Sequence, residues 1–280
     1  MSNQPVHSVD ELKRIALRMR LDIVKMIGAA GSGHPGGSLS EVELLTALYF
    51  RVMRHDAKNP TWADRDRFIL SKGHGCPALY ATYAEAGYID PRLLNTLRKL
   101  GSPLQGHPDK RMLPVLEAST GSLGQGLSIG IGTALTAKLD KRDFHTFVMV
   151  GDGEIEEGQI WEAAMFAGFH KLTNLTCIVD NNRQQLDGFV KDILDPAPVA
   201  EKFRAFGWRT AELDGHDFEQ VIPALEEARA AKDGKPTAIV AHTIKGKGVS
   251  FMENNPEWHG VAPKPEQVQA AVRELETAAV

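Results

Sequence analysis

Two oxygen-bearing side chains stand thirty positions apart, each at the end of an apolar run. Asp152 follows the run 147–150, and Asn182 follows the run 175–179. Carboxylate and amide oxygens are hard ligands that suit Mg²⁺ or Ca²⁺, and Mg²⁺ usually leaves places for water and phosphate oxygens. Glycines flank the aspartate, and Gly153 removes a side chain where a phosphate would approach the backbone. These residue types indicate a site for a metal-bridged diphosphate.

The segment between the two side chains forms one structural unit. The two apolar runs are typical of buried strands, and the stretch 161–169 between them is typical of a helix, so they predict a βαβ unit with parallel strands. Ligands bind at the carboxyl ends of such strands, and the start of the crossover helix favours an anion. Taken singly, Asp152 is more often a turn residue and Asn182 a loop residue. Their pairing across one crossover makes the binding site the stronger interpretation.

The spacing of these glycines, the aspartate and the asparagine matches the thiamine diphosphate signature. The chain resembles the N-terminal, diphosphate-binding part of transketolase, and the resemblance covers nearly its whole length. It implies thiamine diphosphate held through Mg²⁺, or Ca²⁺ or Mn²⁺, with Asp152, Asn182 and the main-chain carbonyl of Gln184 as metal ligands. It also implies that Gly153 contacts the diphosphate and that Leu186 supports the thiazolium ring.

Histidines recur in glycine-rich segments of the chain. A single loop histidine is more often structural, but four in such segments match transketolase positions that line the substrate cavity. The resemblance implies catalytic roles for His34, His107 and His259. It places His74 beside the cofactor diphosphate, and it brings Lys245 and His259, fourteen positions apart, to the cofactor region.

Two further segments carry the resemblance. Residues 119–126 match a loop that borders the cofactor rings, which implies cofactor contacts for Gly121, Ser122 and Leu123. Glu157 matches a glutamate that belongs to a network at the subunit interface, and the resemblance groups it with the catalytic residues.

Composition excludes several classes of protein. The 280 residues are 42% hydrophobic and 24% charged, which is ordinary for a globular domain. A formal charge of −4 gives no reason to expect nucleic acid or an anionic membrane as a partner. Cys76 and Cys177 do not suggest a disulfide framework. With no evident secretory signal or spanning segment, we expect a cytoplasmic protein that does not enter a membrane.

The pattern of elements predicts an α/β fold with a doubly wound, mostly parallel sheet flanked by helices. Residues 1–280 are expected to form a single diphosphate-binding domain. The glycine-rich stretch 31–38 predicts a loop, and Ser8 with Glu11 predicts a capping box. The expected helices span residues 9–26, 40–49, 78–86, 90–99, 127–139, 161–169, 199–206, 218–231 and 265–279, and the expected strands span residues 67–70, 147–150, 175–179, 208–213 and 237–242.

The resemblance implies a transketolase reaction, the transfer of a two-carbon ketol unit from a ketose to an aldose. In that family a following domain supplies the glutamate that activates the cofactor and the arginines that grip substrate phosphate. We therefore expect a separate C-terminal subunit that carries the pyrimidine-binding domain, in an assembly of two copies of each chain. Sugars or sugar phosphates are the expected substrates, and the resemblance points to carbohydrate metabolism of the pentose phosphate type.

Two other functions remain open from the sequence. One keeps the cofactor and changes the reaction, as in half of an enzyme similar to 1-deoxyxylulose-5-phosphate synthase or a 2-oxoacid dehydrogenase. The other is a non-catalytic subunit that binds the cofactor and serves as a scaffold. The sugar-facing histidines favour ketol transfer over the first, and the presence of every expected cofactor and histidine position argues against the second.

Overall fold

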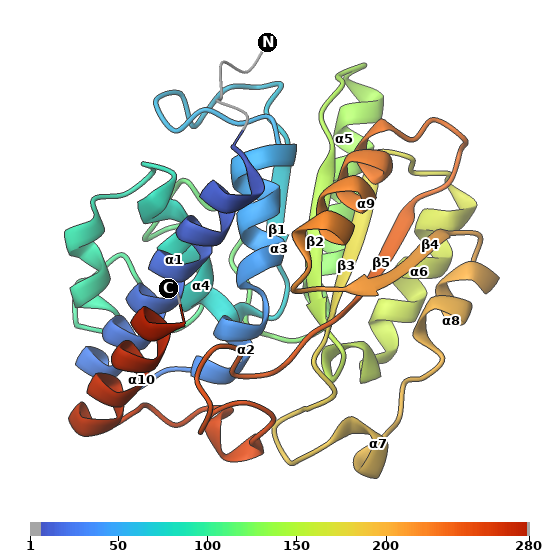
Figure 1. Ribbon diagram of the computed structural model, residues 1–280. Coiled ribbons are helices and arrows are strands. Elements are labelled where there is room, and N and C mark those ends of the chain that lie inside the picture. The colour runs from blue at the N-terminus through green and yellow to red at the C-terminus, as the bar shows by residue number, and fades with distance from the viewer. Residues whose placement is uncertain (1–6, 279–280) are drawn as a thin grey trace.

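The centre of the molecule is a sheet of five parallel strands. A computed structural model describes residues 7–278 (Figure 1). The strand order is β1-β2-β3-β5-β4, so β5 lies between β3 and β4. In register, Gly151 pairs with Asp180 and Asn181 pairs with His242, which aligns the ends of β2, β3 and β5 at one edge. The strands are β1 (Arg67–Leu70), β2 (Thr146–Gly151), β3 (Leu175–Asn181), β4 (Arg209–Asp214) and β5 (Thr237–His242).

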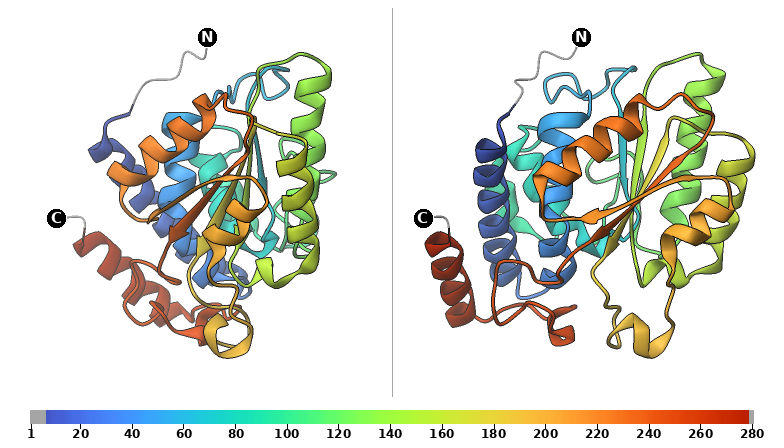
Figure 2. Two further views of the ribbon diagram at one scale, coloured as in Figure 1. Left: turned by 90° about the vertical axis from the view of Figure 1, so that its right-hand side faces the viewer. Right: turned by 45° about the vertical axis from the view of Figure 1, so that its right-hand side comes forward.

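Helices cover both faces of the sheet, as Figure 2 shows. Successive strand residues alternate between two apolar clusters, because side chains in a strand point to opposite faces. Phe147 and Met149 pack with α1, α3, α4 and α9, whereas Val148 and Val150 pack with α5, α6 and α8. The α-helices are α1 (Val9–Ala30), α2 (Pro35–Ser40), α3 (Val42–Ala47), α4 (Cys76–Glu85), α5 (Gln125–Leu139), α6 (Gly158–Phe169), α7 (Val190–Ile193), α8 (Val199–Ala205), α9 (Phe218–Ala230) and α10 (Pro265–Thr277).

Five short helices of other types complete the described elements. They are the π-helix η1 (Leu48–Val52) and the 3₁₀-helices η2 (Gly73–Gly75), η3 (Pro91–Thr96), η4 (Glu154–Glu156) and η5 (Pro256–Trp258). The π-helix directly follows α3, and η2 directly precedes α4.

The predicted α/β architecture is confirmed, with a fully parallel sheet. The predicted capping box is also present, because Ser8 Oγ accepts the N–H of Glu11 at 3.3 Å and the glutamate accepts the N–H of Ser8 at 2.7 Å. The closing helix was predicted to reach residue 279. Helix α10 ends at Thr277, and residue 279 lies outside the described residues.

Two predicted elements were wrong. Residues 35–40 lie in the stretch predicted as a loop, yet they form α2, and all six are buried. A Cβ at Gly36 would lie 2.9 Å from the Trp258 carbonyl oxygen, so tight packing outweighs the low helix propensity of glycine there. The predicted helix 90–99 is only the 3₁₀-helix η3. Leu94 is its one buried residue, so no apolar stripe supports an α-helix.

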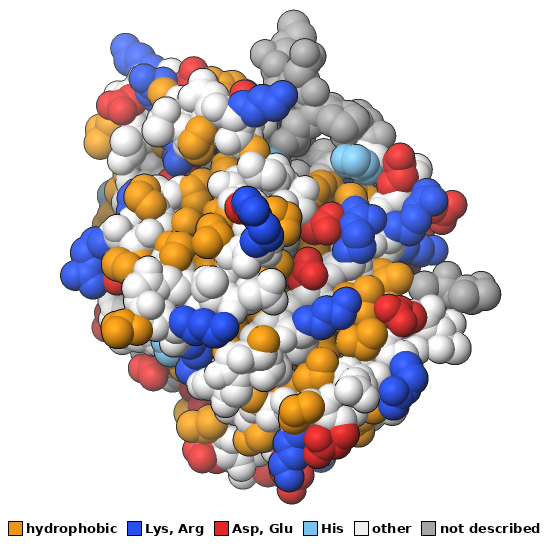
Figure 3. Space-filling model, turned by 90° about the vertical axis from the view of Figure 1, so that its left-hand side faces the viewer, with side chains coloured by type: hydrophobic (Ala, Val, Ile, Leu, Met, Phe, Trp, Pro, Cys, Tyr) orange, Lys and Arg blue, Asp and Glu red, His pale blue; other side chains and the backbone are white. Residues whose placement is uncertain are grey.

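The surface and the cysteines agree with a globular, disulfide-free chain. Figure 3 shows acidic and basic side chains interspersed over the face that α1 and α10 present. Cys76 and Cys177 are both buried thiols. Within residues 7–278 no helix has the length and apolar character needed to cross a bilayer.

Candidate active site at the carboxyl edge of the sheet

Asp152 and Asn182 meet where β2 and β3 end. The Asp152 N–H donates to the Asp180 carbonyl at 3.3 Å, which continues the β2–β3 pairing by one residue. The Asp152 carboxylate accepts N–H groups from Gly153, at 2.9 Å, and from Arg183. The structure therefore brings the predicted aspartate against the loop that carries the predicted asparagine.

The environment of the Asp152 carboxylate suits a bound cation. Its side chain is 1% exposed, and burial, with a contribution from the nearby Asp180, raises its pKa to about 7. A divalent cation would compensate the buried charge and favour the ionised carboxylate. Within the described residues no group of three or more His, Cys, Asp or Glu side chains could hold a metal. The predicted ligand set contains one carboxylate, one amide and one carbonyl, so it is of a different kind.

The main chain and the side chain of Gln184 are both arranged as expected for a residue beside a bound ligand. Its carbonyl oxygen lies 3.4 Å from Lys245 Nζ, so the main chain faces the lysine. Its side-chain amide is buried, and neither Oε1 nor Nε2 has a hydrogen-bond partner within the described residues. A buried amide without partners is rare in a folded protein, and a bound group or ordered water commonly supplies them.

Gly153 is required by close packing. A Cβ at this position would lie 2.6 Å from Gln185 Cβ, a distance that real side chains do not reach. The absence of a side chain lets the β2 end and the loop after β3 approach each other. The glycine predicted to admit a phosphate therefore also admits the facing loop.

Lys245 links this edge to the histidines. Its Nζ lies 2.7 Å from His259 Nδ1, and the side chain is 2% exposed. Burial lowers the pKa of Lys245 to about 8, and the Lys72 cation acts in the same direction, whereas Asp152 opposes the change. An anionic ligand would stabilise the charged form of Lys245.

The four predicted histidines converge from four separate segments. Ring centroids are 5.2 Å apart for His34 and His74, 5.5 Å for His34 and His259, and 5.3 Å for His74 and His259. His107 lies farther out, 6.2 Å from His34. We call these four residues the histidine cluster.

Burial favours the neutral form of each member of the histidine cluster. Burial lowers the pKa of His34 to about 4 and of His259 to about 3, and it holds the pKa values of His74 and His107 below the usual range. Neutral imidazoles offer one donor and one acceptor each. Such a set can bind several hydroxyl groups and move protons between them.

The loop before α5 rests on two of these histidine segments. A Cβ at Gly73 would lie 2.8 Å from the backbone nitrogen of Gly121, and a Cβ at Gly121 would lie 3.2 Å from the His107 ring. The Leu123 carbonyl accepts a hydrogen bond from Gln159 Nε2 at 3.0 Å. The predicted ring-binding loop is therefore held between the His74 segment and α6.

Three predicted site residues lie at the surface. Leu186 is 65% exposed, and Ser122 and Glu157 are exposed as well. Glu157 occupies the N-cap position of α6 without a side-chain capping bond. The part of the site predicted to hold the cofactor rings is therefore open.

A buried ion network beneath the histidines was not predicted. Lys72 Nζ lies 2.6 Å from Asp180 Oδ2 and 2.9 Å from Glu41 Oε2, and it donates to the Gly37 carbonyl at 2.9 Å. Asp180 Oδ2 also accepts from Asn182 Nδ2 at 3.1 Å. The network thus fixes the predicted amide ligand. The sequence feature that could have indicated this network is a charged residue, Lys72 or Asp180, at the end of each of two apolar strands.

Glu154 is a second residue that sequence reasoning missed. Its carboxylate accepts the Gly124 N–H at 2.8 Å, the Gly151 N–H at 3.0 Å and the Ser71 hydroxyl. One buried carboxylate therefore ties together the ring-binding loop, the end of β2 and the end of β1. The signal was weak, because the first residues after a Gly-Asp-Gly turn are commonly solvated.

A third unpredicted group holds the Lys245 loop. Arg20 makes two hydrogen bonds to Glu43, at 2.6 and 2.8 Å, and the same glutamate lies 2.8 Å from His216 Nδ1. His216 Nε2 accepts the N–H of Ile244 at 2.9 Å. This chain of contacts joins α1 and α3 to the residue that precedes Lys245.

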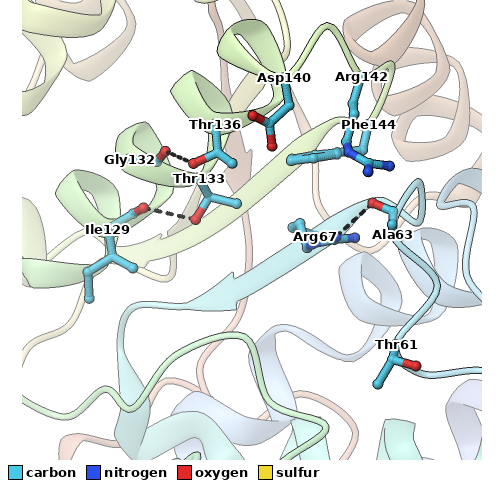
Figure 4. Close-up of a pocket in the computed structure, with 10 residues that line it drawn as sticks. All are labelled: Thr61, Ala63, Arg67, Ile129, Gly132, Thr133, Thr136, Asp140, Arg142 and Phe144. Carbon is cyan, nitrogen blue, oxygen red and sulfur yellow. Dashed lines mark hydrogen bonds between the residues drawn. The ribbon is translucent and has the colours of Figure 1, made fainter.

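The large cavity in Figure 4 lies at the opposite end of the sheet. It holds about 550 Å³ and is bordered by the start of β1, the segment before β2 and one face of α5. Arg67 donates to the Ala63 carbonyl at 2.9 Å and sits 4.5 Å from the Phe144 ring centroid. Thr133 and Thr136 donate to carbonyls of their own helix. These polar groups are already paired, so the cavity is not where the candidate chemistry lies.

Comparison with known proteins places this chain in a family. Residues 12–278 match the family described as transketolase, thiamine diphosphate binding domain. The chain is 44% identical over 279 residues to a 6-deoxy-6-sulfo-D-fructose transketolase subunit, SqwG, of a Clostridium species, covering 99% of this chain and 98% of that one. It is also 44% identical over 269 residues to an apulose-4-phosphate transketolase subunit of Actinobacillus succinogenes, covering 96% and 97%.

Solved structures agree. The transketolase of Campylobacter jejuni superposes with a TM-score of 0.90 at 33% identity, and the match covers 96% of this chain but only 43% of that one. The parallel sheet and these matches define the cofactor-binding part of a thiamine diphosphate enzyme. The chain belongs to the transketolase N-terminal, thiamine diphosphate-binding family. The predicted resemblance is confirmed.

Proposed function

We propose that this chain is the cofactor-binding subunit of a two-subunit transketolase, which moves a two-carbon ketol unit from a ketose to an aldose. The convergence of the histidine cluster beside Lys245 and Asp152 supports this function most directly. The predicted metal ligands suit a diphosphate cofactor, and several neutral imidazoles suit a substrate with many hydroxyl groups.

The residues at the carboxyl edge fit a Mg²⁺-bound diphosphate. We assign the metal to the Asp152 carboxylate, the Asn182 amide oxygen and the Gln184 carbonyl. The raised pKa of Asp152 supports this, because a cation would favour its ionised carboxylate. The partnerless side-chain amide of Gln184 indicates space for a bound group or ordered water beside the same loop. Ca²⁺ or Mn²⁺ could occupy the same oxygen ligands.

The remaining site residues hold and orient reactants. Lys245 and His74 lie where a diphosphate would need donors, and Gly121, Ser122, Leu123 and Leu186 border the open end. When bound, thiamine diphosphate supplies the nucleophilic carbon that accepts the ketol unit. His34, His107 and His259 would then bind substrate hydroxyls and move their protons.

The partner subunit is proposed to dock on α5 and α6. Met165, Phe166 and Phe169 are exposed along α6, Ile129 is exposed on the neighbouring α5, and Phe169 is 79% exposed. Exposed apolar side chains on two packed helices are typical of an interface. Glu157 opens the same helix, which supports its proposed place in an interface network. We propose that the partner carries the pyrimidine-binding domain and that two copies of each chain assemble.

The substrates are proposed to be sugars or sugar phosphates. The names of the relatives specify a sulfonated sugar for one and a phosphorylated sugar for another. The histidine cluster binds hydroxyl groups that such sugars share, so it does not distinguish them. The cytoplasm is the proposed location, and the pentose phosphate type of carbohydrate metabolism is the proposed setting.

Reconstitution tests the two-subunit enzyme. The tagged chain would be purified from its own cells with thiamine diphosphate and Mg²⁺, and its complexes would be weighed by native mass spectrometry. We expect a second chain in the complex, ketol transfer by the complex, and cofactor binding without ketol transfer by the chain alone. Full ketol transfer by the chain alone would contradict the proposal.

A donor screen on the same complex separates the reactions. Ketose donors are expected to be used, whereas use of pyruvate or another 2-oxoacid would favour the synthase-like or dehydrogenase-like reaction. Phe169→Glu is expected to prevent assembly, because it puts a charge into the apolar face. Leu100→Glu is a matched control, since Leu100 is fully exposed but lies outside α5 and α6.

A further inference from the structure

Arg98 stands at the rim of the histidine cluster in a strained conformation. Its φ of 58° is in the left-handed region, which costs a non-glycine residue free energy and often marks a functional position. The Arg98 N–H donates to the Leu104 carbonyl at 2.9 Å, which closes the short loop between them. The loop thus holds the arginine in one place at the expense of backbone strain.

The guanidinium of Arg98 sits in a built cradle. Nη1 donates to Ser32 Oγ at 2.9 Å, and Nη2 donates to the Gly106 carbonyl at 3.3 Å. A Cβ at Gly106 would lie 2.9 Å from Arg98 Cζ, so a side chain at this position would displace the guanidinium. Two segments besides its own therefore shape this position, which none of the predicted site residues occupies.

The remaining contact of the guanidinium is with His34. Nη2 lies 3.4 Å from His34 Nδ1. A guanidinium can only donate, so Nδ1 must be the acceptor and the imidazole proton must lie on Nε2. The Nε2 edge of the ring faces Gly260, since a Cβ there would lie 3.5 Å from Nε2. That edge is turned toward the segment that carries His259.

We propose that Arg98 is a positioning residue that holds His34 as the neutral tautomer with its proton on Nε2, so that this nitrogen donates to a substrate hydroxyl. The role of His34 toward substrate rests on the proposed function. The tautomer itself depends only on the contacts of this chain.

The charges around His34 act in the same direction. The groups that face it are Arg98, Lys245 and the other three members of the histidine cluster. After burial, Arg98 has the largest effect in lowering the pKa of His34. A fixed cation beside Nδ1 opposes a second proton on that nitrogen.

The direct test is nitrogen NMR on the full chain with ¹⁵N-labelled histidine. Long-range ¹⁵N–¹H correlation distinguishes the two neutral tautomers of each imidazole. In the wild type we expect the His34 proton on Nε2. In Arg98→Met we expect a mixture of tautomers and a His34 pKa higher by about one unit, because a neighbouring cation is removed. An unchanged tautomer and an unchanged pKa would overturn the proposal.

Two further variants serve as a control for this experiment and as a substitute for Arg98→Met. Arg92→Met is the matched control, because Arg92 is 90% exposed and pairs with Asp90 of its own segment. It is expected to leave His34 unchanged. If Arg98→Met does not fold, Arg98→Gln keeps a polar side chain but loses the cation, and its amide can donate or accept. We then expect a mixture of tautomers and a higher His34 pKa. A fully retained Nε2 tautomer with an unchanged pKa in Arg98→Gln would also overturn the proposal.

Kinetics on the assembled two-subunit enzyme separate this inference from the proposed function. Arg98→Met is expected to lower kcat/KM for a ketose donor at least about tenfold and to keep cofactor affinity within about twofold of the wild type. A parallel loss of cofactor affinity would assign Arg98 to the fold and contradict the positioning role. If the wild type transfers no ketol unit, the proposed function fails, whereas the NMR result still decides the tautomer.

Discussion

The two ends of the candidate site differ in how complete they are. At the diphosphate end, Asp152, Asn182 and Lys245 are buried, and each makes a hydrogen bond to β3 or to the loop after it. At the ring end, Leu186 and Ser122 are exposed to solvent. This chain encloses the diphosphate end, whereas it leaves the ring end open to solvent.

The difference shows how the work of the site is divided. Buried polar groups are costly unless paired, so the diphosphate end must be ordered by the fold itself. The ring end has no such requirement, because its residues remain hydrated until something covers them. Substitutions at the first end should therefore affect the isolated chain, and substitutions at the second should matter only in the assembled enzyme.

The largest expected effect is on stability, from Lys72→Met. Removing the lysine leaves the Asp180 carboxylate buried without its cation. Breaking a buried ion pair on one side costs about 3–5 kcal/mol, so the free energy of unfolding should fall by that amount. Urea unfolding of the isolated chain measures it. A loss below about 1 kcal/mol would show that the diphosphate end is not held by this network.

Asp152→Asn comes next and concerns ligand affinity. The substitution removes the one carboxylate of the proposed metal ligands, so the affinity for thiamine diphosphate with Mg²⁺ should fall at least about 100-fold. Fluorescence titration of the isolated chain checks this, and circular dichroism monitors the fold. Unchanged affinity would remove Asp152 from the metal site.

Glu41→Gln tests the buried network around Lys72 through the pH dependence of stability. Burial raises the pKa of Glu41 to about 8, despite the opposing effect of Lys72, so the carboxyl is protonated in the folded chain at neutral pH. In the unfolded chain it ionises near 4.5. The wild type therefore loses stability as pH rises between these values, with a slope of up to ~1.4 kcal/mol per pH unit.

The glutamine variant lacks this titration. Relative to it, the wild type should become progressively less stable from pH 5 to about pH 8. Urea unfolding of both proteins across that range gives the difference. A constant difference would mean that Glu41 titrates alike in the folded and unfolded chains.

The smallest effect is expected at the open end. Leu186→Ala removes a side chain that is 65% exposed, so the free energy of unfolding should change by no more than about 0.5 kcal/mol. Cofactor affinity of the isolated chain should be unchanged, while ketol transfer by the assembled enzyme should decrease. A large loss of stability in the isolated chain would show that the ring end is already packed.

Periodicity and spacing predicted the framework well. The βαβ unit from β2 to β3 follows from two apolar runs and a helical stretch between them, and parallel register then brings Asp152 to the Asn182 loop. The convergence of the histidines was expected from the family resemblance, because their segments are distant in the sequence. Pattern alone does not place loops in space.

Other features could not be predicted for physical reasons. Helix α2 contains two glycines, and only the close approach of Trp258 and Lys245 explains why it is helical. Lys72 is an exposed residue type by preference, and its burial depends on Asp180, which lies 108 positions later. The cradle of Arg98 depends on a left-handed backbone that no periodicity reports.

The strand order has a consequence for how the site comes into being. Strand β5 is the last in sequence, yet it lies between β3 and β4, and β4 has no other neighbour among the described strands. The sheet therefore closes only when residues 237–242 insert, and Lys245 and His259 follow them. During synthesis, a nascent chain would have no complete cofactor site until the residues up to His259 have emerged. Cofactor would then act by mass action on the finished fold and would not template its formation.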